Sequence, residues 1–251
     1  MPGSYSRRTF LKLGAMLPVL PAVHDRNLSV TPDDEKIQQL LKSDKPNTWV
    51  FSGDSVTQGA HHTFGCRSYS EIFSERVRWE MRRVTDMVIN SGVNGTNTDH
   101  LLQNFDWLVG QFKPAVVSVM FGLNDCQVPQ ITPAVFETNL LTILKKIRAM
   151  NAIPVLQTPN GIDHAGIALM KTASREKVPD YIRVMEQVAK ENKIILVNNW
   201  QYWNNAGLDT FKAWLDDPFH PNAEGHLRIA RLFFKEISIF DRNAFTCSGK
   251  K

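Results

Sequence analysis

Five short, continuous apolar segments are spaced along the chain, and longer amphipathic segments separate them. Runs of this kind are typical of strands that are buried on both faces of a parallel sheet. The runs cover residues 48–52, 87–90, 115–121, 153–157 and 194–198. They predict a five-stranded sheet whose strands are all covered on both sides.

The segments between these runs show the periodicity of amphipathic helices. Apolar residues recur there at intervals of three and four positions, as one face of a helix requires. The three clearest sets are Tyr69, Ile72, Phe73, Val77 and Met81; Phe136, Leu140, Leu144 and Ile147; and Leu227, Ala230, Phe233 and Phe234. Near the N-terminus, Thr31, Pro32 and the acidic residues after them predict the start of a short helix that runs through Leu41.

Strict alternation of strand and helix predicts an α/β fold in which a parallel sheet lies between two layers of helices, a three-layer α/β/α sandwich. Ligands of such folds bind at the carboxyl ends of the strands. One longer irregular stretch, residues 159–179, follows the fourth strand and is expected on that rim.

The first residues have the features of an export signal. The pair Arg7-Arg8 precedes an apolar stretch at 13–23 that is too short to span a membrane. This order resembles a twin-arginine translocation signal. We therefore expect residues 1–24 to be a signal read by the twin-arginine export machinery, residues 25–251 to form a single domain, and the product to be periplasmic or secreted. A basic, disordered N-terminus and retention of the segment as an anchor are the alternatives.

Composition and charge exclude several classes of protein. The 251 residues are 43% hydrophobic and 22% charged, as in ordinary globular domains, and no apolar run is long enough for a stable membrane span. The net charge of +4 owes three cations to the first 24 residues, which contain no acid, so the remainder carries 26 basic and 25 acidic residues. That balance lacks the positive field that nucleic-acid binding needs.

The three cysteines, Cys66, Cys126 and Cys247, are too few and too far apart for a disulfide framework or a metal motif. A bridge between Cys66 and Cys126 stays open as an alternative, because both follow strands that end on the same rim.

Candidate chemistry lies just beyond the ends of the first three strands. Ser55 follows the first strand in the sequence Gly53-Asp54-Ser55, which is a suitable position for a nucleophile. Gly95 and Asn124 follow the second and third strands. The backbone N–H groups of Ser55 and Gly95 and the side-chain amide of Asn124 could together stabilise a developing oxyanion.

The fourth element is the turn from Asp216 to Pro221, directly before the last amphipathic helix. A carboxylate three residues before a histidine can accept a hydrogen bond from its Nδ1–H, so that Nε2 faces the serine as a general base. Asp217 has that spacing from His220, and the neighbouring Asp216 is the competing acid.

These four blocks, in this order, resemble those of the SGNH or GDSL hydrolases. The resemblance implies a flavodoxin-like sheet and ester hydrolysis through an acyl-enzyme, without a metal or organic cofactor. By position, it implies Ser55 as the nucleophile, His220 as the base and Asp217 as the acid that orients it. It also implies an oxyanion hole made of Ser55, Gly95 and Asn124, in which Gly95 is favoured over Gly92 by its spacing from Asn90.

Two further groups of residues allow alternative interpretations. The pair His61-His62 could suggest a metal site, but no carboxylate lies beside it at ligand spacing, so we expect a loop and no metal. A segment rich in Trp and Asn, predicted as a loop, precedes the histidine turn. Its aromatic side chains could stack on a sugar ring or pack beneath the loop; they are Trp200, Tyr202, Trp203 and Trp214.

Together these features predict an exported serine esterase that hydrolyses small acyl esters, with acetyl groups on carbohydrates as the favoured substrate. The chain has no long apolar lid that would suit fatty acyl groups. A lipase, lysophospholipase or thioesterase is the alternative within the family. A non-catalytic glycan-binding relative is the alternative outside enzymes.

Overall fold

A computed structural model describes residues 32–170 and 174–248 of the chain. Its centre is a five-stranded sheet in the order β2-β1-β3-β4-β5, in which every neighbouring pair is parallel. The strands are β1 Thr48–Gly53, β2 Met87–Asn90, β3 Val116–Met120, β4 Ile153–Gln157 and β5 Ile195–Val197. The predicted α/β class and five-stranded parallel sheet are confirmed. The predicted export signal lies outside the described residues.

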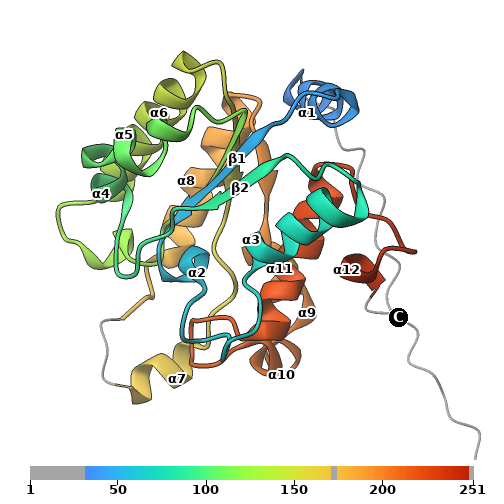
Figure 1. Ribbon diagram of the computed structural model, residues 1–251. Helices are drawn as coiled ribbons and strands as arrows, with labels where there is room; N and C mark the ends of the chain where they lie inside the picture. The colour runs from blue at the N-terminus through green and yellow to red at the C-terminus, as the bar shows by residue number, and fades with distance from the viewer. Residues whose placement is uncertain (1–31, 171–173, 249–251) are drawn as a thin grey trace, which may run out of the picture.

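Helices cover both faces of the sheet (Figure 1). One layer contains α3 and α11, which contact each other, and the other contains α4, α6 and α8. The helices are α1 Pro32–Lys42, α2 Ser55–Gln58, α3 Tyr69–Ser74, α4 Thr98–Gln103, α5 Phe105–Leu108, α6 Pro133–Ala149, α7 His164–Leu169, α8 Val178–Glu191, α9 Asn199–Ala206, α10 Leu208–Phe211, α11 Ala223–Glu236 and α12 Phe245–Ser248. A π-helix, η1 Glu75–Glu80, and three 3-10 helices, η2 Gly110–Phe112, η3 Asp125–Gln127 and η4 Lys212–Trp214, complete the structure.

Two expectations about these elements are wrong. β2 is not buried on both faces: Met87 is 56% exposed, because β2 pairs only with β1 and lies at the edge of the sheet. The stretch 159–179 is not irregular throughout, since it contains α7 and the first two residues of α8. In the two described ranges, every helix is too short or too polar to cross a lipid bilayer.

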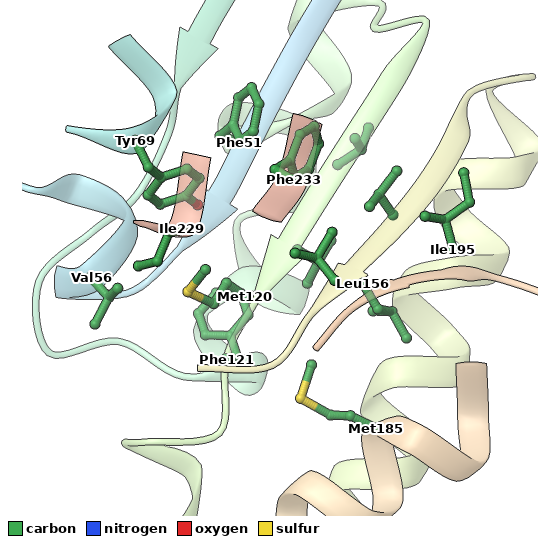
Figure 2. Packing of buried hydrophobic residues seen from close by; sticks show 14 of the residues in the cluster. Phe51, Val56, Tyr69, Met120, Phe121, Leu156, Met185, Ile195, Ile229 and Phe233 are labelled. Atoms are coloured by element: carbon green, nitrogen blue, oxygen red, sulfur yellow. The ribbon is translucent and has the colours of Figure 1, made fainter. Parts of the chain in front are cut away.

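The core fixes the first strand firmly against the helices (Figure 2). The ring of Phe51 in β1 lies 5.6 Å from that of Tyr69 and 5.0 Å from that of Phe73, both in α3, and 5.3 Å from that of Phe233 in α11. All four side chains are almost fully buried. Each aromatic pair contributes about 0.5–1.5 kcal/mol beyond its area burial. The carboxyl end of β1, where Ser55 follows, is therefore held in a rigid frame.

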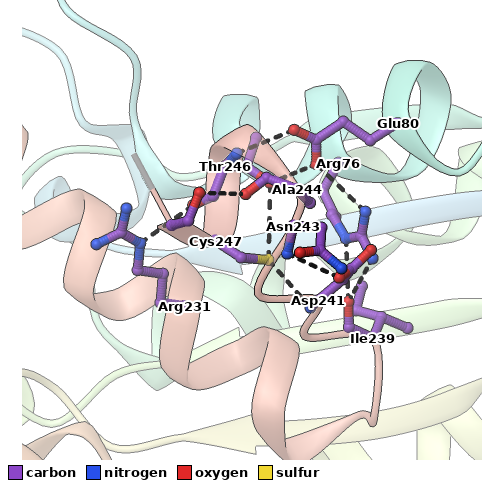
Figure 3. Close-up of polar contacts among 10 residues, drawn as sticks. Arg76, Glu80, Arg231, Ile239, Asp241, Asn243, Ala244, Thr246 and Cys247 are labelled. Atoms are coloured by element: carbon purple, nitrogen blue, oxygen red, sulfur yellow. Dashed lines mark hydrogen bonds and ion pairs between the residues drawn. The ribbon is translucent and has the colours of Figure 1, made fainter. Parts of the chain in front are cut away.

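The C-terminal segment is fastened to η1 by two buried or nearly buried side chains (Figure 3). The guanidinium of Arg76 donates to the carbonyl oxygen of Ile239 at 3.0 and 2.8 Å. The carboxylate of Glu80 accepts from the N–H and the hydroxyl of Thr246 at 2.9 and 2.6 Å. Hydrogen bonds to charged groups contribute about 1.5–3 kcal/mol each, so these contacts hold the end of α11 and the residues after it in place.

Candidate active site

Ser55 stands at the first position of α2, directly after β1. The preceding residue, Asp54, caps this short helix by accepting the N–H of Val56 at 3.0 Å. Gly53 allows the end of β1 to pass close to β3 and α2. A Cβ there would lie 2.6 Å from the carbonyl oxygen of Met120 and 2.1 Å from the hydroxyl of Thr57. The strand, the cap and the glycine thus present a partly exposed Ser55 side chain at the rim of the sheet.

A continuous chain of hydrogen bonds links Ser55 to a carboxylate 162 residues further along. Ser55 Oγ lies 2.9 Å from Nε2 of His220, and His220 Nδ1 lies 2.6 Å from Oδ2 of Asp217. Because Oδ2 can only accept when the carboxyl is ionised, Nδ1 carries the ring hydrogen and Nε2 is left to accept from the serine. The sequence left Asp216 and Asp217 as alternatives for this carboxylate; Asp217 makes the contact.

Asp217 is kept ionised by its surroundings. Its partial burial acts to raise its pKa, but hydrogen bonds from the His220 ring and from the backbone N–H groups of Phe219 and His220 lower the pKa to about 2. The two backbone bonds, at 2.9 and 2.8 Å, both end on Oδ1. The negative charge of Asp217 therefore faces the His220 ring over the whole pH range in which a histidine can act as a base.

The turn that carries His220 is closed on itself. The N–H of Asp216 donates to the carbonyl of His220 at 2.9 Å, and Leu215 and Pro221 form an antiparallel bridge. The next residue, Asn222, caps α11 by accepting the N–H groups of Glu224 and Gly225. This closure explains why His220 and Asp217 keep a fixed relation to each other.

Two glycines follow β2, and the structure gives them different roles. Gly92 donates its N–H to Asn90 Oδ1 at 3.0 Å, and a Cβ there would lie 2.5 Å from the backbone nitrogen of Gln58. Gly95 has a φ of +75°, open space around its Cβ position and, among the described residues, no hydrogen-bond partner for its N–H. Gly92 packs against α2, whereas the backbone N–H of Gly95 is free to donate to a ligand.

Asn124 is joined to the loop that contains Gly95. Its side-chain amide donates to the carbonyl of Thr96 at 2.9 Å. An amide nitrogen carries two hydrogens, so one remains for a ligand. The same loop is fixed by buried Asp125, which accepts from the N–H and hydroxyl of Thr98 at 2.9 and 2.5 Å and from the N–H of Gly122 at 3.0 Å.

His62 lies at this site, which the sequence did not reveal. Its ring stacks on that of His220, with centroids 3.8 Å apart and planes 12° apart, and its Nδ1 lies 2.8 Å from Oδ2 of Asp216. The sequence has no carboxylate at ligand spacing beside the His61-His62 pair, and the structure brings one there from a distant turn of the chain. Ligand atoms of His62, Asp217 and His220 lie within 4.8 Å of one another and, among the described residues, form a set that could hold a metal ion.

Arg175 is the second residue at the site without a sequence signal. Its guanidinium lies over the ring of Phe219, 3.9 Å from the centroid, and it is almost fully buried. Burial lowers its pKa, whereas the charges of Cys126, Asp54 and Asp217 act in the opposite direction. A guanidinium thus lies near the turn that carries His220.

The aromatic segment and the cysteines are also placed by the structure. The predicted loop of Trp and Asn residues is the helix α9, capped by Asn198. Trp203 is fully buried and contacts Trp214 at a ring distance of 5.2 Å, so these two side chains pack in the interior and do not stack on a ligand. All three cysteines are free, and Cys66 is not bridged to Cys126.

Known proteins resemble this chain over most of its length. The model of the GDSL-like lipase/acylhydrolase family matches residues 51–228. The chain is 26% identical over 206 residues to the acetylxylan esterase of Geobacillus stearothermophilus, which covers 75% of this chain and 92% of that protein. It is 24% identical over 211 residues to the uncharacterized lipoprotein YqeF of Bacillus subtilis (strain 168), with 75% of this chain and 86% of that protein covered.

Solved structures share the fold. A catalytic mutant of Axe2, the acetylxylan esterase from Geobacillus stearothermophilus, has a TM-score of 0.64 at 24% identity, with 78% of this chain and 96% of that chain covered. A putative GDSL-like lipase from Parabacteroides merdae ATCC 43184 has a TM-score of 0.66 at 20% identity, with 78% and 97% covered.

Proposed function

The chain belongs to the GDSL-like lipase/acylhydrolase family and is a carboxylic ester hydrolase, and from that premise we propose that it is a serine esterase that removes acetyl groups from carbohydrates. The observation that carries this proposal is the hydrogen-bonded chain from Ser55 Oγ through the His220 ring to Asp217, with 2.9 and 2.6 Å contacts. Such a chain is the arrangement by which a serine becomes a nucleophile.

In the acylation step, Ser55 Oγ attacks the ester carbonyl carbon and its proton passes to Nε2 of His220. Asp217 stabilises the imidazolium that forms. The oxyanion accepts hydrogen bonds from the N–H groups of Ser55 and Gly95 and from the Asn124 amide, each of which contributes about 10²–10³ in rate. When the tetrahedral intermediate collapses, the bond to the alcohol breaks and His220 returns the proton to the alcohol oxygen.

In the deacylation step, water takes the place of the alcohol. His220 accepts a proton from the water as its oxygen attacks the acyl carbon, and then returns that proton to Ser55 Oγ as the acid leaves. No step of this mechanism draws on a metal or an organic cofactor.

The acetyl-carbohydrate substrate is supported by the relative named acetylxylan esterase, which is matched over 92% of its length. Export by the twin-arginine route belongs to the same proposal. The order of residues 1–24 supports this route, and the relative named as a lipoprotein supports export in general.

Hydrolysis of p-nitrophenyl acetate by the wild type and by Ser55→Ala tests the nucleophile. We expect the variant to lose at least about 10³-fold in kcat, and equal rates for the two proteins would refute the assignment. Acetylated xylo-oligosaccharides and long-chain p-nitrophenyl esters, tested in parallel, separate the proposed esterase from a lipase. Preference for the long-chain esters would overturn the substrate proposal and leave the nucleophile intact.

A further inference from the structure

The site contains two histidine–carboxylate pairs that lie side by side. Asp217 accepts from Nδ1 of His220, and Asp216 accepts from Nδ1 of His62. The two imidazole planes differ by 12° and their centroids are 3.8 Å apart, which is van der Waals contact between the rings. The proposed function uses the first pair and leaves the second without a role.

The second pair is anchored at both ends. Asp216 is tied to the base itself, because its N–H donates to the carbonyl of His220 at 2.9 Å. The N–H of His62 donates to the carbonyl of Ala60 at 2.9 Å, within the loop that joins α2 to α3. The side chains of His62 and Asp216 are only 18% and 21% exposed. The contact therefore clamps the loop after Ser55 onto the turn that carries His220.

The orientation of the His220 ring needs more than one contact. The torsion that turns a histidine ring about its Cβ–Cγ bond has a broad energy profile, so rotamer preference does not fix the ring plane. The bond to Asp217 holds one ring atom but leaves freedom to tilt. The stacked ring of His62 removes that freedom, with help from Phe219, whose ring centroid is 4.2 Å from that of His220.

Asp216 also determines which nitrogen of His62 carries hydrogen. A carboxylate only accepts, so the bond at 2.8 Å assigns the hydrogen to Nδ1 of His62.

We propose that His62, held by Asp216, is a positioning residue that keeps the His220 ring in the plane in which Nε2 meets Ser55 Oγ. This inference rests on the proposed function, in which His220 is the base. Misplacement of a reacting group by about 1 Å costs about 10²-fold in rate. We therefore expect His62→Ala to lower kcat for p-nitrophenyl acetate by about 10- to 100-fold, while KM stays within about twofold.

Substitutions at the pair separate stacking from hydrogen bonding. His62→Phe keeps a flat ring and should recover most of the lost kcat, whereas His62→Asn keeps a short polar group without a ring and should not. Asp216→Ala should lower kcat by less than His62→Ala does, because the His62 ring remains but loses the carboxylate that holds it. The double variant His62→Ala/Asp216→Ala should be no slower than His62→Ala alone, because the two residues act as a unit. His61→Asn is the matched control: His61 is exposed and has a φ of +71°, which asparagine tolerates.

A spectroscopic measurement keeps the test independent of turnover. The Nδ1 proton of His220, bound to Asp217, should give a low-field proton NMR signal that is absent in Asp217→Ala. We expect this signal to broaden or shift in His62→Ala and to be unchanged in His61→Asn, with thermal unfolding confirming that each variant is folded.

An unchanged signal with wild-type kcat in His62→Ala would overturn the proposal. A raised KM with unchanged kcat would also overturn it, because His62 would then be a substrate contact. If Ser55→Ala is as active as the wild type, the proposed function fails, and the NMR signal alone decides the role of His62.

Discussion

Asp216 and Asp217 are neighbours in the chain, but their carboxylates bind the Nδ1 atoms of two different histidines, Asp216 that of His62 and Asp217 that of His220. The turn between Leu215 and Pro221 makes this division. Asp217 folds back to accept the N–H groups of Phe219 and His220, and this leaves the side chain of Asp216 to meet the loop after α2. Two acids with similar sequence context thus have different consequences for the site.

The first prediction contrasts these two acids. Asp217→Asn keeps the shape of the side chain, but its amide can present an N–H to His220 and favour the wrong tautomer, so we expect kcat to fall by about 10³–10⁴-fold. Asp216→Asn retains an oxygen that accepts from His62, so a loss of less than about tenfold is expected. Steady-state kinetics with p-nitrophenyl acetate measures both. Similar losses in the two variants would contradict the division of roles.

The second prediction concerns Asn124. Its amide hydrogen is proposed to bind the oxyanion, which exists only in the transition state and the intermediate, so Asn124→Ala should lower kcat by about 10²–10³-fold with little change in KM. Asn104→Ala is the control, since the Asn104 amide also donates to a backbone carbonyl, that of His100 at 2.9 Å, but on an exposed helix end. A rise in KM without a fall in kcat would exclude a role for Asn124 in the oxyanion hole.

Much of the fold could be predicted from the sequence because local physics decides it. A central parallel strand is covered on both faces and therefore appears as an unbroken apolar run; the predicted strand 153–157 agrees with β4 at both ends. β2 has the same apolar character, and its position at the edge depends on the order of strands, which the pattern does not contain. The helix α9 was predicted as a loop although Asn198 caps it by accepting the N–H of Gln201 at 3.0 Å, because its many Trp and Asn residues have low helix propensity.

The candidate site was predictable only where local spacing carries information. Asp217 and His220 share one turn, and Ser55 follows a strand end, so their types and positions suggest chemistry. His62 and Asp216 are 154 positions apart, and Arg175 meets Phe219 across different loops. Such contacts depend on which loops converge above the sheet, and no periodicity or motif encodes that.

The third prediction separates the two glycines after β2. A Cβ at Gly92 would lie 2.5 Å from the backbone nitrogen of Gln58 and 2.9 Å from the backbone carbon of Thr57, and neither atom can move without displacing α2. We expect Gly92→Ala to lower the free energy of unfolding by about 1–3 kcal/mol and to lower kcat as well, because α2 carries Ser55.

Gly95→Ala is the matched comparison. Its Cβ meets no atom within 4 Å, so the cost is the strain of a φ of +75° in a residue with a side chain, about 1–2 kcal/mol, while the N–H remains in place. Urea unfolding and kinetics of the two variants check the prediction. We expect kcat per folded molecule to fall more in Gly92→Ala than in Gly95→Ala, and the reverse order would contradict the assignment of Gly92 to packing.

The last prediction concerns Asp54, the acid that precedes the proposed nucleophile. Complete burial raises its pKa from the ordinary 3.8 to about 7, although the N–H of Val56 opposes the shift. Between these two values the unfolded chain releases the proton while the folded protein keeps it, so the contribution of Asp54 to stability is lost as the pH rises towards 7. Since each pKa unit corresponds to about 1.4 kcal/mol, this loss amounts to about 3 kcal/mol between pH 5 and pH 8.

Asp54→Asn removes the titrating group but keeps an oxygen that can accept the N–H of Val56. We therefore expect its free energy of unfolding, measured in urea relative to that of the wild type, to rise by about 3 kcal/mol on going from pH 5 to pH 8, because only the wild type loses stability over this range. Burial lowers the pKa of His226 to about 3, which makes acid destabilise the fold, but this effect is common to both proteins and cancels in the difference. Exposed Asp209→Asn is the control and should show no such pH-dependent difference. A constant difference between Asp54→Asn and the wild type across this range would show that Asp54 is already ionised in the folded protein at pH 5.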